Sequence, residues 1–147
     1  MINRNGSAVW KGSIKEGNGV VSTETGTLSN AQYSFSSRFE SGTGTNPEEL
    51  LGAAHAACFS MALSGVLTRG GLIPDTISTT AMVTVENIDG GFKITKVRLS
   101  TEGVIPNATD AQFQEAAATA KANCPVSKLF TGAEITLDAK LVSAVGA

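Results

Sequence analysis

The stretch NPEELLGAAHAACFSMALSGVLTR, residues 46–69, carries the strongest structural signal in this 147-residue chain. Asn46 is a good helix N-cap, Pro47 suits the first helical position, and Glu49 stands where it can reach back to the cap. The Gly-Gly pair that follows the stretch supplies a stop. We therefore predict one helix over residues 47–69, about 34 Å long.

The middle of this predicted helix is apolar on every side rather than along one stripe. Such a helix must be surrounded by other apolar groups, and one chain of this size has little material to surround it alone. Its Ala and Gly residues also permit close approach of another backbone. We therefore predict that a second subunit covers the helix. The longest apolar stretch, residues 50–63, is shorter than a membrane span needs, which favours a buried helix without membrane contact.

The rest of the chain contains short strand and helix patterns. Short β-prone runs predict strands at residues 8–10, 20–23 and 33–35. Residues 81–99 predict a hairpin of two strands, with a bulge near Thr95 and Lys96. A clean alternation predicts the last strand at residues 134–141. A capping box begins a second helix at Thr109, which runs to about Asn123, where Cys124-Pro125 interrupts it. Strands and helices are segregated, so we predict an α+β fold in a single domain, residues 1–147.

Composition excludes several classes of function. With 11 Lys+Arg against 13 Asp+Glu, the net charge is −2, so an electrostatic binder of nucleic acid or of anionic membrane is not expected. The N-terminus has no apolar segment typical of a secretory signal, so we expect a cytoplasmic protein. Two cysteines and one histidine cannot complete a structural zinc site without carboxylates, and we predict no metal. In a reducing compartment, a lone cysteine pair is more often catalytic or redox-active than structural.

The two cysteines occupy different positions. Cys58 lies in the middle of the first helix, and its position alone favours an inert buried thiol. Cys124 lies at a helix break, where the following turn, residues 125–130, can stabilise a thiolate. If the two sulfurs approach each other, one can attack a peroxide and the other can capture the resulting sulfenic acid as a disulfide. The spacing leaves open whether they meet.

A thiolate that reduces peroxide also needs a cation beside it. Arg38 is a candidate because it follows an apolar strand, and Glu48 could hold its guanidinium. Each could equally be a solvated surface charge. Glu48 stands ten residues before Cys58, about 15 Å of helix rise. If both serve one site, either the helix is broken or Glu48 comes from the partner subunit, and we favour the partner. His55 lies one turn before Cys58, which permits a Cys-His nucleophile, but a buried core or interface histidine is the commoner case.

Specific motifs identify a resemblance at this point. Residues 46–63 closely resemble the first cysteine motif of the OsmC/Ohr family, in its OsmC branch, and residues 123–127 (NCPVS) resemble the second. Further segments look like the same family, namely residues 10–12, 21–26, 38–40 and 133–137. The resemblance covers essentially the whole chain, with both motifs in the correct order.

The resemblance implies an OsmC-like fold, in which antiparallel strands and a long buried central helix form an intertwined homodimer with active sites at the subunit interface. It implies a thiol-dependent peroxidase that reduces organic hydroperoxides, and hydrogen peroxide less well, to alcohols and water without metal, haem or other cofactor. Cys58 then matches the peroxidatic cysteine, Cys124 the resolving one, and Arg38 and Glu48 the pair that activates the thiol.

The family is associated with oxidative and osmotic stress. In the Ohr branch, dihydrolipoyl groups on proteins serve as the dithiol reductant. Two other functions stay open on the residues alone, namely a Cys-His acyl-transfer enzyme and a non-catalytic stress or small-ligand binding protein.

Overall fold

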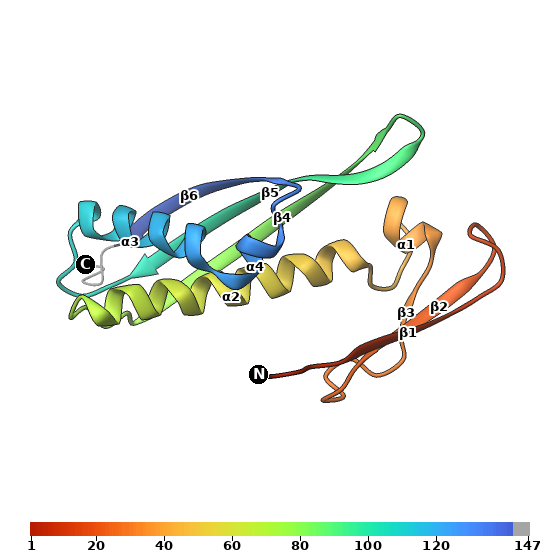
Figure 1. Cartoon of the computed structure of the whole chain (residues 1–147), viewed down its shortest axis with the longest axis horizontal. Coiled ribbons are helices and arrows are strands. Elements are labelled where there is room, and N and C mark those ends of the chain that lie inside the picture. Colours follow the sequence, from red (N-terminus) through yellow and green to blue (C-terminus); the bar gives the residue numbers. More distant parts are fainter. Residues whose placement is uncertain (143–147) are drawn as a thin grey trace. The chain divides into compact units, whose positions relative to one another are not determined.

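The computed structural model describes residues 1–142 and contains two compact units, one formed by Met1–Leu50 and one that begins at Leu51. Figure 1 shows the order of elements, βββ-αα-ββ-αα-β, which confirms the α+β class. Helix α2 (Pro47–Arg69) begins in the first unit and lies mostly in the second. Its bounds are those predicted from the caps, and it runs without a break. The prediction of a single domain stays a prediction.

The first unit is built on a small antiparallel sheet of β1 (Gly6–Lys11), β2 (Asn18–Thr23) and β3 (Ala31–Tyr33). Gly19 of β2 pairs with Trp10 on one side and with Tyr33 on the other. The two aromatic rings approach to 5.4 Å over it. A Cβ atom at Gly19 would lie 2.6 Å from the Tyr33 ring, so the glycine gives the aromatic pair its room.

One local prediction in this unit is wrong. The strand expected over residues 33–35 ends at Tyr33, and a short helix, α1 (Phe35–Phe39), follows it. Ser34 caps this helix by a capping box with Ser37. Arg38 therefore lies on a helix rather than just after a strand. The serine-rich sequence permits a turn at this point, and the local side-chain hydrogen bonds select it.

The second unit contains a sheet in the order β4-β5-β6, formed by β4 (Thr76–Ile88), β5 (Gly91–Val104) and β6 (Glu134–Val142). The β4–β5 hairpin is longer than predicted. The predicted bulge is confirmed, because Thr84 pairs with Lys96 while Val85 pairs with Ile94, which leaves Thr95 as the extra residue.

Strand β6 departs from the expected antiparallel arrangement, because it pairs parallel to β5. Helices α3 (Asp110–Asn123) and α4 (Pro125–Leu129) carry the chain from the end of β5 back to its start. A crossover of this kind brings the next strand in parallel. The alternation of the sequence predicts the strand but carries no information about its direction.

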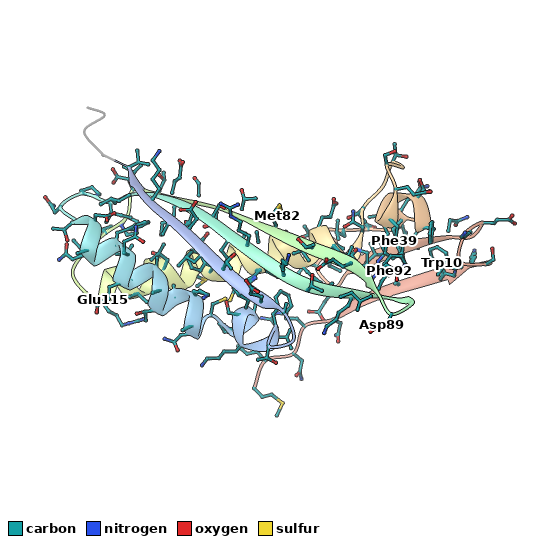
Figure 2. All side chains as sticks on the ribbon, turned by 90° about the horizontal axis from the view of Figure 1, so that it is seen from above. Trp10, Phe39, Met82, Asp89, Phe92 and Glu115 are labelled. Carbon is teal, nitrogen blue, oxygen red and sulfur yellow. The ribbon has the colours of Figure 1, made fainter. Side chains whose placement is uncertain are left out.

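Helices α2 and α3 cover one face of this sheet, and Met82 projects from the opposite face (Figure 2). The core between sheet and helices is formed by Phe59, Leu63, Leu67, Leu99, Phe113, Ala117 and Ala120. At Gly52, the helix runs so close to β4 that a Cβ atom would lie 2.9 Å from the Ala81 carbonyl oxygen. A residue that weakens a helix by propensity therefore serves the packing of α2 on the sheet.

The other side of α2 is only partly covered within the chain. Ala53, Ala57 and Met61 are exposed, Met61 by 80%. By length and composition, the whole of α2 (Pro47–Arg69) is sufficient to cross a membrane, whereas the expectation of too short a segment concerned residues 50–63 alone. The core helix of a soluble protein meets the same criterion, and Phe59 and Leu63 of α2 are fully buried in the core. The absence of membrane contact stays a prediction.

Candidate active site

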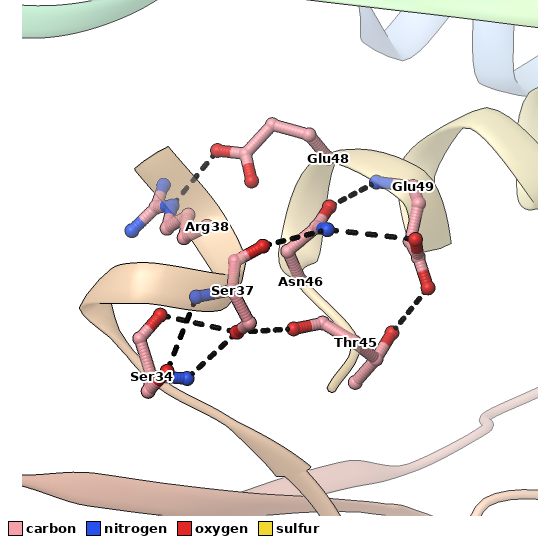
Figure 3. A network of polar contacts seen from close by, with 7 residues as sticks. All are labelled: Ser34, Ser37, Arg38, Thr45, Asn46, Glu48 and Glu49. Atoms are coloured by element: carbon pink, nitrogen blue, oxygen red, sulfur yellow. Dashed lines mark hydrogen bonds and ion pairs between the residues drawn. The ribbon is translucent and has the colours of Figure 1, made fainter. Parts of the chain in front are cut away.

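The first unit contains a charged pair, Arg38 and Glu48. The Nε of Arg38 lies 2.8 Å from Oε1 of Glu48 (Figure 3). The bond uses Nε and not the two terminal nitrogens of the guanidinium. The guanidinium also lies 4.9 Å from the centre of the Phe39 ring. Glu48 thus fixes one edge of the arginine, as the sequence analysis expected for a carboxylate beside it.

A network of serine, threonine and asparagine holds α1 against the start of α2 (Figure 3). The Ser37 hydroxyl donates to the Thr45 carbonyl at 2.8 Å, and the Asn46 amide donates to the Ser37 carbonyl at 3.2 Å. Asn46 also accepts from the Glu49 backbone at 2.7 Å, which confirms it as the N-cap of α2. These bonds fix the two helix ends that carry the charged pair.

Glu48 and Arg38 have different surroundings. The Glu48 side chain is only 9% exposed, whereas that of Arg38 is 37% exposed. Oε2 of Glu48 is buried without a hydrogen-bond partner among residues 1–142. Arg38 opens onto a cavity of about 340 Å³ with a largely aromatic lining. The other lining residues are Trp10, Ile14, Tyr33, Ser34, Phe35 and Phe39. The charged pair therefore stands at the edge of an apolar cavity.

The second unit contains a thiol pair, Cys58 and Cys124. Both are free cysteines, and their side chains interact directly. Cys58 projects from the middle of α2, and Cys124 stands between α3 and α4 and is fully buried. The sequence left open whether the two sulfurs meet, and the fold brings them together.

The two thiols have opposite acidities. Burial raises the pKa of the Cys124 thiol, but hydrogen bonds from Cys58, from the Ser127 backbone and hydroxyl and from the Val126 amide outweigh it, so its pKa lies below the ordinary value. Burial and the interaction with Cys124 raise the pKa of Cys58. The amides act on the Cys124 sulfur without closing a formal cap hydrogen bond. This agrees with the expectation that the turn after Cys124 stabilises its thiolate.

His55 is a completely buried side chain next to the thiol pair. Its Nε2 lies 2.8 Å from the Ser127 hydroxyl, and its ring packs edge-on against Phe130 at 5.2 Å. Burial lowers the pKa of His55, which keeps the ring neutral. The expectation of a buried histidine is confirmed. Ser127 belongs to the second cysteine motif, residues 123–127, but the sequence assigned it no role of its own.

The structure thus describes two partial sites. The charged pair lies in the first unit and the thiol pair lies in the second. Glu48 and Cys58 are ten residues apart on the unbroken helix α2. Within residues 1–142, no group of three or more His, Cys, Asp or Glu residues lies together as metal ligands would. The groups of the charged pair and the thiol pair can perform thiol chemistry assisted by a fixed guanidinium.

Comparison with known proteins gives consistent results. The family model described as OsmC-like protein matches residues 40–140. The chain is 51% identical to "Peroxiredoxin OsmC" of Escherichia coli (strain K12) over 97% of this chain and 99% of that protein. It is 35% identical to "Organic hydroperoxide resistance protein OhrB" of Bacillus subtilis (strain 168) over 69% of this chain and 71% of that protein.

Solved structures are similar over nearly the whole length. The crystal structure of OhrB of Bacillus subtilis gives a TM-score of 0.72 at 27% identity, and covers 92% of this chain and 98% of that one. An organic hydroperoxide resistance protein from Elizabethkingia anophelis gives 0.73 at 27% identity, with 97% and 98% covered. The fold is therefore shared along nearly the whole chain.

Proposed function

Because the chain belongs to the OsmC-like protein family, we propose that it is a thiol-dependent peroxidase that reduces organic hydroperoxides, and hydrogen peroxide less well, to alcohols and water. The observation that carries the proposal is the thiol pair: two free cysteines in direct contact, one of them beside hydrogen-bond donors that lower its pKa. The relatives' names, a peroxiredoxin and an organic hydroperoxide resistance protein, support the same class of reaction and a role in defence against oxidative stress. A role in osmotic stress is part of the proposal through the resemblance to the OsmC branch.

The reaction uses each thiol once. The Cys58 thiolate attacks the distal oxygen of the hydroperoxide; an S–O bond forms, the O–O bond breaks, and the leaving alkoxide takes a proton to give the alcohol. The Cys124 thiolate then attacks the sulfur of the Cys58 sulfenic acid. An S–S bond forms and hydroxide leaves, taking a proton to give water. An external dithiol reduces the disulfide by two exchange steps and restores both thiols.

The charged pair supplies what Cys58 lacks in its own unit. Burial and Cys124 raise the pKa of Cys58, so a cation must act on it for the thiolate to form. Arg38 is that cation, and Glu48 holds it in place through the 2.8 Å bond. The aromatic cavity beside Arg38 suits the apolar part of an organic hydroperoxide, which is the reason to expect hydrogen peroxide as the poorer substrate.

We further propose a homodimer in which the charged pair of one chain serves the thiol pair of the other. Ten residues of unbroken helix, about 15 Å of rise, separate Glu48 from Cys58. The exposed side of α2 at Ala53, Ala57 and Met61 is apolar and small enough for close packing of a second copy.

The composite site is tested by complementation. Arg38→Ala and Cys58→Ser chains should each be inactive alone. When the two variants are co-expressed, about half of the dimers contain one chain of each kind. Each such dimer has one intact site and one inactive site. We therefore expect the mixture to have about a quarter of the activity of the same amount of wild-type protein. Failure of the mixture to recover activity would refute a site shared between chains.

We propose that the protein acts in the cytoplasm. Turnover needs both thiols reduced, and the cytoplasm keeps thiols reduced. The reductant is a dithiol, and a dihydrolipoyl protein is the candidate. No nucleic acid, membrane, metal or other cofactor takes part in the proposed cycle.

The decisive experiment is an anaerobic titration of the reduced protein with cumene hydroperoxide, followed by counting of free thiols. We expect the loss of two thiols per chain for each hydroperoxide consumed. No loss of thiols refutes the peroxidase. Burst release from a thioester substrate without peroxide consumption would instead identify an acyl-transfer enzyme.

A further inference from the structure

Helices α2 and α4 contact each other through two pairs of side chains with the same spacing. His55 and Cys58 lie three residues apart on α2, and Cys124 and Ser127 lie three residues apart at the start of α4. The fold sets His55 against Ser127, as it sets Cys58 against Cys124. His55 is 0% exposed and Ser127 is 7% exposed, so water does not compete for the contact between these two side chains. The reaction described above assigns no role to either residue.

The hydrogen bond between them has a direction. His55 Nε2 lies 2.8 Å from the Ser127 hydroxyl oxygen, while Nδ1 is buried without a partner in the described part of the chain. Buried N–H groups that lack an acceptor are rarer than buried acceptors that lack a donor. The proton therefore lies on Nε2, which donates to the Ser127 oxygen. The hydrogen of that hydroxyl is then left to donate elsewhere, and the Cys124 sulfur accepts it.

We propose that His55 and Ser127 form a hydrogen-bond relay that keeps the Ser127 hydroxyl donating to the Cys124 sulfur and thereby tunes the step in which Cys124 closes the disulfide. This inference rests on the proposed function, because it takes Cys124 as the resolving thiol. Ser127 contacts the reacting sulfur directly. His55 is a positioning residue that acts through Ser127, and its packing against Phe130 fixes its ring.

The relay acts on the Cys124 thiolate, which forms the S–S bond while hydroxide leaves Cys58; the Cys58 sulfur is reduced and the Cys124 sulfur is oxidised. A donor on this thiolate raises its population but lowers its nucleophilicity. When the pKa of Cys124 falls by one unit, the logarithm of the thiolate's rate constant falls by about 0.4–0.5. Below the pKa, the logarithm of the thiolate fraction rises by a full unit. The gain in thiolate population therefore dominates below the Cys124 pKa. Each unit of pKa is then worth roughly threefold in rate. Above the pKa, where the thiolate is complete, the donor slows the step.

The titratable groups closest to Cys124 are the Cys58 thiol and the His55 ring, both on α2. Lys121 of α3 and Lys128 of α4 flank it in sequence. His55 is kept neutral by burial, so it contributes a dipole and a donor rather than a charge. The expected pH dependence of the step therefore reports the Cys124 thiol.

The test measures disulfide formation after the reduced full-length protein is mixed with an equimolar amount of cumene hydroperoxide, across a range of pH. The first oxidation of Cys58 is followed separately as consumption of hydroperoxide, because Cys58 and Cys124 interact and Ser127→Ala can change both steps. Disulfide formation should be slower than in the wild type by roughly threefold per unit of pKa rise at low pH, and faster at high pH. Ser127→Thr keeps a hydroxyl and should restore the wild-type profile.

Ser60→Ala is the matched control. It removes a serine from α2 that donates to the Thr79 hydroxyl at 2.7 Å and lies outside the relay. We expect its disulfide rate to follow the wild-type profile at every pH. An equal slowing in Ser60→Ala and Ser127→Ala would identify a loss of packing and overturn the relay.

His55 is tested by a pair of variants. His55→Gln can place an amide N–H near the position of Nε2, whereas His55→Leu removes the donor. We expect His55→Leu to shift the pH profile in the same direction as Ser127→Ala, and His55→Gln to restore most of the shift. Titration of Cys124 by thiolate absorbance in a Cys58→Ser background gives the same comparison without peroxide.

The outcomes separate this proposal from the function on which it rests. A Ser127→Ala protein with the wild-type pH profile overturns the relay and leaves the peroxidase intact. A wild-type protein in which hydroperoxide never joins Cys58 to Cys124 refutes the resolving role itself. If Ser127→Ala does not fold, the contrast between His55→Gln and His55→Leu decides the proposal.

Discussion

The two sulfurs of the thiol pair are the same chemical group in opposite surroundings. Cys58 lies in the interior of α2, where backbone N–H groups are already bonded within the helix, and burial raises its pKa. Cys124 lies where α3 ends and α4 begins, where backbone amides have no partner within a helix and donate to the sulfur instead, and its pKa is lowered despite burial. Within its own unit, the chain thus lowers the pKa of the thiol that we propose to resolve the sulfenic acid, but not the pKa of the thiol that we propose to attack the peroxide.

This difference shows why the charged pair matters. A helix interior can position a nucleophile accurately, but it supplies no charge, and the Val126 amide that reaches Cys58 lowers its pKa less than burial and Cys124 raise it. A cation must therefore reach Cys58 from elsewhere, and the first unit presents a guanidinium already fixed by a buried carboxylate. The functional asymmetry of the two cysteines follows from where the helices start and stop.

The largest expected effect comes from removing each sulfur in turn. Cys58→Ser should abolish hydroperoxide turnover, because no other thiol receives the cation. Cys124→Ser should still consume one hydroperoxide per chain and then recycle slowly, since the sulfenic acid has no partner. Single-turnover consumption of cumene hydroperoxide measures both. Full activity in Cys58→Ser, or a single turnover only in that variant, would reverse the assignment of the two thiols.

Removal of the carboxylate should have the next largest effect. Glu48→Gln keeps the shape of the side chain but breaks the ion pair with Arg38, so we expect kcat/KM for cumene hydroperoxide to fall by about tenfold to a hundredfold, the cost of a charge-assisted bond. In a Cys124→Ser background, the pKa of Cys58 should rise.

The neighbouring Glu49→Gln is the matched control for this variant. Glu49 bonds to the Thr45 hydroxyl at 2.8 Å and does not form the ion pair with Arg38. We expect it to change stability slightly and the reactivity of Cys58 very little. Equal losses of kcat/KM in the two variants would contradict a specific role for the charged pair.

The sequence predicted those features of the fold that depend on local chemistry. Asn46 and Pro47 mark the start of α2, Thr109 marks that of α3, and the reversal of alternation around Thr95 marks the bulge. The parallel pairing of β6 was not predictable, because alternation carries no direction. The strand predicted over residues 33–35 failed because Ser34 could equally cap a helix.

The site divides in the same way. Motif resemblance named Cys58, Cys124, Arg38 and Glu48, and the fold brings them together in two pairs. The contact between His55 and Ser127 joins residues 72 apart in sequence. No local pattern reports such a contact, and for that reason Ser127 was missed.

The third expected effect concerns His55 and the stability of the thiol region. Burial lowers the pKa of His55 below its ordinary value of 6.5. As pH falls below about 6.5, the unfolded chain takes up a proton that the folded ring does not. Stability is therefore constant above this pH and decreases below it, until the pH reaches the folded pKa. Urea unfolding of the wild type at several pH values measures this loss.

The comparison with His55→Gln isolates the contribution of the ring. Carboxylates also weaken the fold in acid, but they do so equally in both proteins. We expect the difference in unfolding free energy between wild type and variant to be constant above pH 6.5 and to change in favour of the variant below it. A constant difference across the whole range would show that the ring is not kept neutral by burial.

The smallest expected effect tests the helix break itself. Pro125 keeps Cys124 out of helical geometry, with ψ at 127°, and thereby leaves the amides after it unpaired. Pro125→Ala permits α3 to continue through Cys124, so that those amides bond within the helix instead of lying beside the sulfur. We expect a small rise in the pKa of Cys124 and a loss of about 0.4–1 kcal/mol in stability from the more flexible unfolded chain.

Pro47→Ala separates these two consequences, because Pro47 is the first residue of α2 in the same way that Pro125 is the first residue of α4. It should cost a similar amount of stability and leave the titration of Cys124 unchanged, since no thiol stands at that helix start. Thiolate absorbance in the Cys58→Ser background measures the titration, and thermal unfolding measures the stability. If both proline variants leave the Cys124 titration unchanged, the donors of Ser127 and Cys58 alone lower its pKa, and the break serves only to place the sulfur.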